Sequence, residues 1–193
     1  MATIGLDNLY YATITEDDKG EETYGTPVKL AKAISAELSV EVAEAILYAD
    51  DAASESVKAF KSGKITLGVD ELGATNAAAL LGARVDSKGV LVSSTEDTSP
   101  YVAVGFRALK ANGKYRYFWL YKVQFSNPSA SLQTKNDSIS FQNPSIEGTI
   151  LRRNKEDTAG KHLWKTEVTE GETGVDAATV SGWFTTVYEP SYK

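Results

Sequence analysis

Residues 113–125 read GKYRYFWLYKVQF, and this stretch decides the fold that the sequence predicts. Successive side chains of a β-strand point to opposite sides of the sheet. The even positions therefore share one face, with the apolar Phe118 and Leu120 between the charged Arg116 and Lys122. Because both faces carry apolar side chains that need cover, we predict a central strand that is buried on both sides. The odd positions share the other face and are aromatic almost throughout: Tyr115, Tyr117, Trp119, Tyr121, Val123 and Phe125.

The residues before this strand predict its partner. Asn112 and Gly113 form a strong hairpin signal, because both residue types tolerate positive φ. Residues 101–109, just before that turn, place apolar side chains at every second position. We therefore predict that these two strands are antiparallel neighbours.

The remaining chain predicts more strands and two short helices. Apolar and polar residues alternate at 34–42 and again at 64–70, which is typical of strands with one exposed face. Residues 75–82 begin with the capping residue Thr75 and end in glycine, and residues 176–182 begin with Asp176, so both predict helices of about two turns. Because strands and helices do not alternate, we predict a mainly β, antiparallel sandwich or barrel with short flanking helices.

Length, charge and cysteine content limit the class of protein. A chain of 193 residues suits a single domain spanning residues 1–193. Its 20 basic and 26 acidic residues give a net charge of −6, which repels nucleic acid. The absence of cysteine excludes disulfides and thiolate metal sites. No long apolar run predicts a membrane helix and no secretory signal is visible, so we expect a soluble protein made in a cytoplasm.

The sequence contains no motif for catalysis, metal binding or nucleotide binding. The single histidine, His162, follows a charged loop and has no motif-linked partner, and there is no G-x-S-x-G motif. The acidic pairs Asp17-Asp18 and Asp50-Asp51 lack the spacing of a calcium loop, and glycine-rich phosphate loops are missing. We therefore expect no catalytic residue, no metal site and no cofactor.

Two segments of unusual composition remain to be explained. Lys122 and Arg116 interleave with aromatic residues, but alternation places these cations on the face opposite the rings, which argues against a nucleic-acid platform. Residues 44–63, EAILYADDAASESVKAFKSG, predict a long hairpin or excursion with few apolar side chains. Ordering such a loop costs about 1–2 kcal/mol of backbone entropy per residue, so we expect it to be stabilised by a partner.

The order of segments along most of the chain resembles the major tail (tail tube) proteins of long, non-contractile-tailed bacteriophages. The resemblance rests on five stretches: TIGLDNLYYATI at the start, PVKLAKAISAELSVEV, ILYADD with SESVKAFKSGKITL, the hairpin GFRALKANGKYRYFWLYKVQF, and FQNPSIEGTILRR. Proteins of that family form a β-sandwich with a flanking helix, assemble into hexameric rings, and stack the rings into a tube in the virion tail.

The resemblance implies a structural virion protein without catalytic residues. DNA passes through the tube without specific binding, and the acidic balance fits a lumen that repels phosphate. Tape measure, tail terminator and distal tail proteins are the implied partners, and no membrane is involved. The strand 115–125 becomes the scaffold core, and residues 44–63 become the loop that contacts neighbouring subunits and rings through Ile46, Leu47, Tyr48, Asp50, Asp51, Val57 and Phe60.

Two alternatives stay open at the level of sequence. The same tube fold serves contractile tails and the ring proteins of secretion devices, and a contractile relative would need a sheath partner. A carbohydrate-binding β-sandwich also fits, because exposed Tyr and Trp side chains on a strand stack on sugar rings as well as they pack a core.

Overall fold

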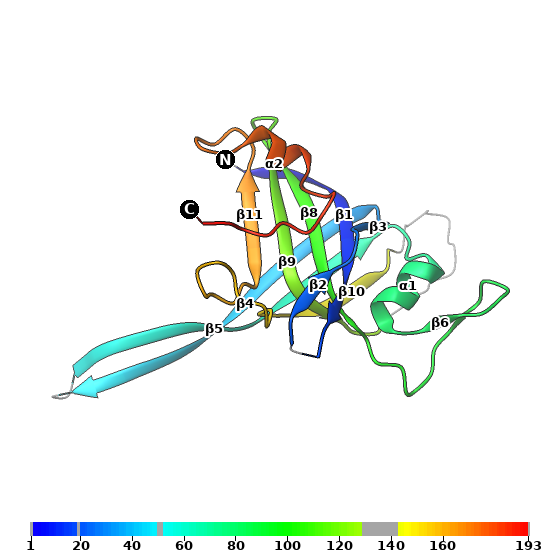
Figure 1. The fold of residues 1–193 in the computed structure, drawn as a ribbon, viewed down its shortest axis with the longest axis horizontal. Coiled ribbons are helices and arrows are strands. Elements are labelled where there is room, and N and C mark those ends of the chain that lie inside the picture. Colours follow the sequence, from blue (N-terminus) through cyan, green and yellow to red (C-terminus); the bar gives the residue numbers. More distant parts are fainter. Residues whose placement is uncertain (1, 19, 50–51, 129–142, 193) are drawn as a thin grey trace, which may run out of the picture.

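The chain folds into an antiparallel β structure with two short helices, which confirms the predicted mainly β class (Figure 1). The computed structural model describes residues 2–18, 20–49, 52–128 and 143–192, without the side chains of 46–49 and 52–55. The strands are β1 (Thr3–Glu16), β2 (Glu22–Tyr24), β3 (Val28–Ala31), β4 (Ala33–Ala49), β5 (Ala52–Val69), β6 (Arg84–Val85), β7 (Leu91–Val92), β8 (Tyr101–Lys110), β9 (Tyr115–Phe125), β10 (Ser145–Leu151) and β11 (Lys165–Thr169). The helices are α1 (Ala74–Leu81) and α2 (Ala177–Ser181).

The central position predicted for β9 is confirmed. The main sheet runs in the order β2-β1-β8-β9-β10-β5-β4, with β3 paired to β1 and β11 paired to β9. β8 and β9 are antiparallel neighbours, as the Asn112-Gly113 turn predicts, and Gly113 has a φ of 79°. β1 and β4 come into contact without pairing, so the curved sheet does not close into a barrel.

A β-bulge in β9 reverses the predicted alternation. Phe125 packs with Leu120 and Val104 on one face of the sheet, whereas Trp119 and Tyr121 pack on the other face. The prediction that all odd positions of the strand share one face is therefore wrong beyond Tyr121, because one extra residue exchanges the two sides of a strand. The extra residue lies between two register pairs that join β8 to β9, Val102–Val123 and Val104–Leu120.

The bulge also moves Lys122 away from its predicted side. Lys122 Nζ lies 2.5 Å from the Glu22 carboxylate of β2. Tyr24 follows Glu22 at the next position on the same face of β2, and its ring contacts Tyr121. Lys122 therefore lies on the same side of the sheet as the aromatic residues, in contrast to the sequence prediction.

Two clusters of buried side chains cover the two faces of the sheet. The inner core includes Leu9, Ile65, Leu67, Val104, Leu120, Phe125 and Ile146. The outer core includes Tyr117, Trp119 and Tyr121 of β9, together with Trp183 and Val187 from the end of the chain. Tyr115 is half-buried beside this cluster, with the Arg107 guanidinium 3.9 Å from its ring centre.

The two predicted helices are both present. α1 ends at Gly82, which has a φ of 72°, but its N-cap is Gly73 and not Thr75. α2 begins as predicted, because the Asp176 carboxylate accepts hydrogen bonds from the backbone N–H groups of Ala178 and Thr179. No helix in the described ranges is long and apolar enough to cross a membrane.

Candidate assembly interface

The longest hairpin of the molecule projects away from the sheet as an arm (Figure 1). β4 and β5 pair from Ala33–Val69 to Ala49–Ala52, but β10 flanks β5 only between Gly63 and Gly68. Residues 41–62 beyond this point have no third strand beside them in the described structure. The predicted excursion at 44–63 is thus a two-stranded ribbon, and its strands begin inside the main sheet.

The root of the arm is held by an aromatic contact. The Phe60 ring stacks on Trp164 with 4.7 Å between ring centres, and Phe60 is half-buried. β5 also has a bulge at this point. Glu41 pairs with Ser62 and the next residue, Val42, pairs with Phe60, so one residue of β5 is extra. Phe60, which the sequence prediction placed in the interface loop, packs its ring within its own chain at the root of the arm.

One face of the described arm is apolar and exposed. Ala43 pairs with Ala59 and Ala45 pairs with Val57, so these four side chains lie on one face. All four are exposed, and Val57 retains 64% of its accessible surface. We call this set, Ala43, Ala45, Val57 and Ala59, the arm patch.

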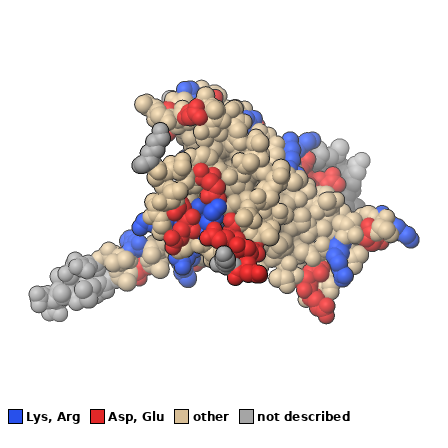
Figure 2. All heavy atoms as spheres, in the orientation of Figure 1, with Lys and Arg blue, Asp and Glu red and all other residues tan. Residues whose placement is uncertain are grey.

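The opposite face of the arm is held together by polar contacts. On this face Glu44 lies 3.2 Å from Lys58 and accepts a hydrogen bond from Ser56. Glu41, which alternation places on the same face as Ala43 and Ala45, lies 3.6 Å from Lys61 at the root of the arm. These pairs are exposed, and exposed ion pairs stabilise a structure by about 1 kcal/mol at most. The described part of the arm between its root and the grey tip is mostly uncharged in the view of Figure 2.

The remaining predicted interface residues are described only in part. Ile46, Leu47 and Tyr48 belong to β4 and pair with Ser56, Glu55 and Ala53. Their side chains lie outside the described residues, as do Asp50 and Asp51 entirely. Only Val57 and Phe60 of the predicted set have described side chains.

β4 forms a long free edge of the main sheet. It is the last strand in the order, and within the described residues it pairs only with β5. Its sequence contains Glu37, Glu41 and Glu44 but no Lys, Arg or His. At the other end of the order, β2 contains the buried Glu22, and β3, which pairs with the same strand β1, carries the exposed Lys29. β3 therefore differs in charge from β4.

The aromatic face of β9 is closed to ligands in this structure. Trp119 and Tyr121 are fully buried, and residues 183–188 lie over them. The Trp119 indole N–H donates to the Trp183 carbonyl at 3.0 Å, and the Tyr121 hydroxyl donates to the Tyr188 carbonyl at 2.7 Å. The sugar-stacking surface required by the carbohydrate-binding alternative is therefore covered.

A buried charge cluster lies beside this aromatic face. Glu22 is fully buried, binds Lys122, and accepts hydrogen bonds from the backbone N–H groups of Asn154 and Lys155. Burial raises the pKa of both Tyr24 and Tyr121, whose hydroxyls lie in the same region. Because Lys122 and Glu22 already neutralise one another, this cluster serves packing and offers no free acid or base.

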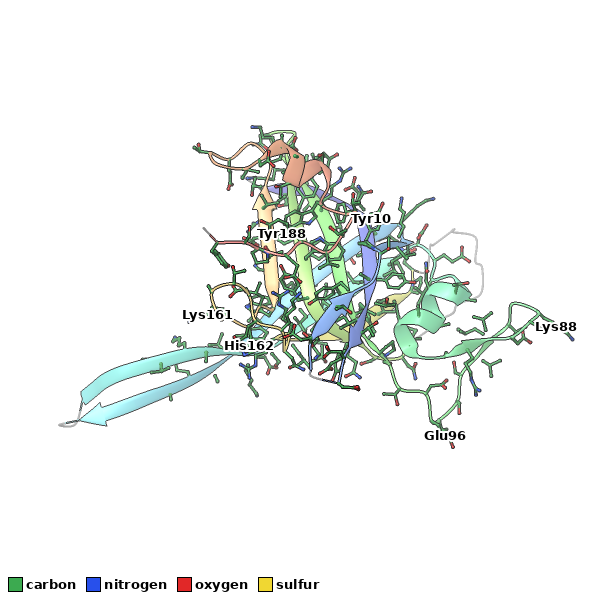
Figure 3. The ribbon with its side chains drawn as sticks, in the orientation of Figure 1. Tyr10, Lys88, Glu96, Lys161, His162 and Tyr188 are labelled. Carbon is green, nitrogen blue, oxygen red and sulfur yellow. The ribbon has the colours of Figure 1, made fainter. Side chains whose placement is uncertain are left out.

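The single histidine and a cavity between β1 and β4 lie apart from the buried charge cluster. His162 lies near the root of the arm (Figure 3), with its Nε2 3.7 Å from the exposed Glu156 carboxylate. In the ranges that the structure describes, no group of three or more His, Cys, Asp or Glu side chains could hold a metal ion. A cavity of about 460 Å³ opens between β1 and β4, and its lining includes Leu6, Leu38 and Phe118 but no titratable side chain.

The arm patch was only partly visible in the sequence. Alanine is common in both strands and helices, so Ala43, Ala45 and Ala59 carried no signal by themselves, whereas the register with β5 places them together. No protein-family model matches this chain, and no curated protein matches it in sequence.

Proposed function

We propose that this protein is a structural subunit that self-assembles into the tail tube of a long, non-contractile-tailed bacteriophage. The observation that carries the proposal is the projecting arm, which exposes an apolar patch and has no cover within its own chain in the described residues. The sequence resemblance to major tail proteins supports the same function and supplies the hexameric ring as the expected unit.

The physics of the arm favours contact with another copy. An isolated two-stranded hairpin is at best marginally stable in water, and the arm patch adds exposed apolar surface. A long free edge such as β4 also presents unpaired backbone groups that readily pair with another strand. Contact with a second subunit would cover the arm patch and would also give hydrogen-bond partners to the unpaired backbone groups of β4.

Charge favours a head-to-tail contact over a symmetric one. Pairing the β4 edges of two copies would bring Glu37 and Glu41 near the same residues of the partner, which is unfavourable. β3, on the other side of the sheet, carries the exposed Lys29, a cation that can pair with these glutamates in a head-to-tail contact. Head-to-tail contacts generate closed rings when the rotation between subunits closes, and rings are the units that a tube needs.

The proposed tube is a conduit and not a DNA-binding device. The net charge of −6 disfavours adhesion of phosphate, so DNA slides through the lumen without specific contacts. Location in the virion tail, and the tape measure, terminator and distal tail proteins as partners, belong to this same proposal.

The test is assembly of the purified protein at increasing concentration. We expect light scattering after size exclusion to detect ring-sized species, and negative-stain microscopy to show rings or tubes of one diameter. Val57→Asp should leave a folded monomer, because a buried unpaired charge at the arm patch opposes contact. Val90→Asp is the matched control, since Val90 is 55% exposed on the separate segment between β6 and β7.

Two outcomes would contradict the proposal. One is a wild-type protein that stays monomeric at every concentration tested. The other is a wild-type protein that assembles while both Asp variants lose assembly equally, which would show that the arm patch has no specific role.

A further inference from the structure

The segment that follows α2 crosses the outer face of the sheet without joining it. Residues 183–192 run over β1, β8 and β9 as an irregular chain, with Tyr188 on the sheet face (Figures 1 and 3). Trp183 and Val187 of this segment are buried in the outer core. We call residues 183–192 the clasp.

The clasp has no backbone ladder to the sheet. Its backbone–backbone hydrogen bonds in the described structure are local, from Trp183 N to Val180 O and from Thr185 N to Gly182 O. Every strand pair of the main sheet lies between residues that precede the clasp. Lifting the clasp therefore breaks no strand pairing.

Side chains of the sheet and loops hold the clasp instead. The Trp119 indole and the Tyr121 hydroxyl donate to clasp carbonyls, and Tyr10 stacks on Phe184 with 4.9 Å between ring centres. Near the end of the clasp, the Tyr192 N–H donates to the Thr158 hydroxyl at 3.2 Å. The Trp183 indole also donates to the Phe118 carbonyl at 3.4 Å, and Trp183 and Val187 are buried in the outer core.

The strongest anchor is a charged one. Arg153 is fully buried, and its Nη1 lies 2.9 and 2.8 Å from the two carboxylate oxygens of Glu189 in the clasp. Lys155 Nζ binds the same carboxylate at 3.3 Å. When the clasp lifts, Arg153 loses its carboxylate partner, whereas the Lys122–Glu22 pair, which involves no clasp residue, stays in place.

We propose that the clasp opens as one unit while the sheet stays folded, and that the Arg153–Glu189 ion pair sets its opening equilibrium. Opening uncovers the aromatic face of Tyr117, Trp119 and Tyr121 and separates the Arg153 guanidinium from its carboxylate partner, so the closed state dominates. The clasp therefore covers the most aromatic surface of the fold in the closed state and uncovers it in the open state. This inference does not depend on assembly into a tube.

Hydrogen exchange of the full chain, resolved to short peptides, tests the proposal. The amides of Thr185 and Tyr192, which are the hydrogen-bonded amides of residues 184–192 in the described structure, should exchange at least tenfold faster than the paired amides of β8 and β9 in the wild-type protein. Glu189→Gln should raise the exchange rate of the clasp by about tenfold or more, the value expected for loss of a charged hydrogen bond. The rates in β8 and β9 should stay unchanged.

Two further variants complete the test. Glu156→Gln is the control, because it removes the same charge from an exposed residue that pairs with His162 and not with Arg153. Tyr121→Phe removes the anchor to Tyr188 without changing charge, and should also raise clasp exchange. The proposal is overturned if the clasp exchanges at the rate of β9, or if Glu189→Gln and Glu156→Gln have equal effects.

Discussion

The indole of Trp119 in β9 occupies the space that a side chain at Gly105 in β8 would need. The two residues are directly paired in the register, and a Cβ added at Gly105 would lie 2.8 Å from atoms of the indole ring. Trp119 is fully buried and hydrogen-bonded to the Trp183 carbonyl, so it cannot easily move aside. A glycine inside a strand normally weakens it, but here the close approach of the ring requires one.

Gly105→Ala should therefore destabilise the protein despite the higher strand propensity of alanine. We expect a loss of about 1–3 kcal/mol in the free energy of unfolding, the cost of overpacking a core. Urea denaturation measures the loss. Gly5→Ala in β1 is the control, because a Cβ there meets Leu109 at an ordinary 3.4 Å. An equal cost for both substitutions would contradict the packing argument.

The buried Lys122–Glu22 pair predicts a strong coupling between two distant residues. Lys122→Met or Glu22→Gln alone should each leave an unpaired buried group and cost about 3–5 kcal/mol. The double variant should cost clearly less than the sum, because neither charge then remains and the glutamine still accepts from the N–H of Asn154. A double-mutant cycle by urea denaturation checks this. Strictly additive losses would refute the coupling.

Two neighbouring tyrosines should respond differently to loss of the hydroxyl. The Tyr121 hydroxyl donates to the Tyr188 carbonyl, whereas in the described structure Tyr24 Oη lies buried near Arg153 without a hydrogen bond of ordinary geometry. Tyr121→Phe should cost about 1 kcal/mol, and Tyr24→Phe should be neutral or stabilising. Thermal unfolding of both variants at pH 7 compares them. The reverse ranking would contradict this prediction.

The same tyrosines predict a loss of stability at alkaline pH. Burial raises the pKa of both Tyr24 and Tyr121, so they stay protonated in the folded protein while the unfolded chain ionises near pH 10. Stability from this source is complete below about pH 10 and falls as the pH rises further. Urea midpoints between pH 8 and 11 measure the fall, which should be shallower in the Tyr24→Phe/Tyr121→Phe double variant.

The stacking of Phe60 on Trp164 predicts that the root of the arm contributes to stability. Phe60→Ala should lower the free energy of unfolding by about 1–3 kcal/mol through lost apolar burial and ring stacking. Val57→Ala, on the exposed arm patch, should change it by less than about 0.5 kcal/mol. Equal effects of the two substitutions would show that the root is not packed as described.

The sequence predicts the fold class well because periodicity and turn residues act locally. The alternation in 64–70, the Asn112-Gly113 turn and the Asp176 cap each depend on neighbours within a few residues, and all three are present in the structure. The Lys122–Glu22 pair joins residues a hundred positions apart, and no local pattern marks Glu22 among the acidic residues around it. The bulge in β9 could not be predicted either, because the strand contains no glycine or proline that would indicate its position.

The candidate interface was predicted in location but not in detail. Composition identified 44–63 as a segment without a core of its own, and the arm extends over nearly the same residues. Composition cannot show which side chains share a face, since that depends on the register of β4 against β5 and on the bulge beside Phe60. The clasp was also missed, because it is held by side chains and has no periodic pattern.

Because β9 contains one extra residue, its odd-numbered positions pack on different faces of the sheet before and after the bulge. Before the bulge the odd positions Tyr117, Trp119 and Tyr121 pack against the outer cluster, whereas after it the odd positions Val123 and Phe125 pack in the inner core. Removing one residue at Tyr121–Lys122 would send every later side chain of the strand to the wrong side, so length here is under stricter constraint than identity.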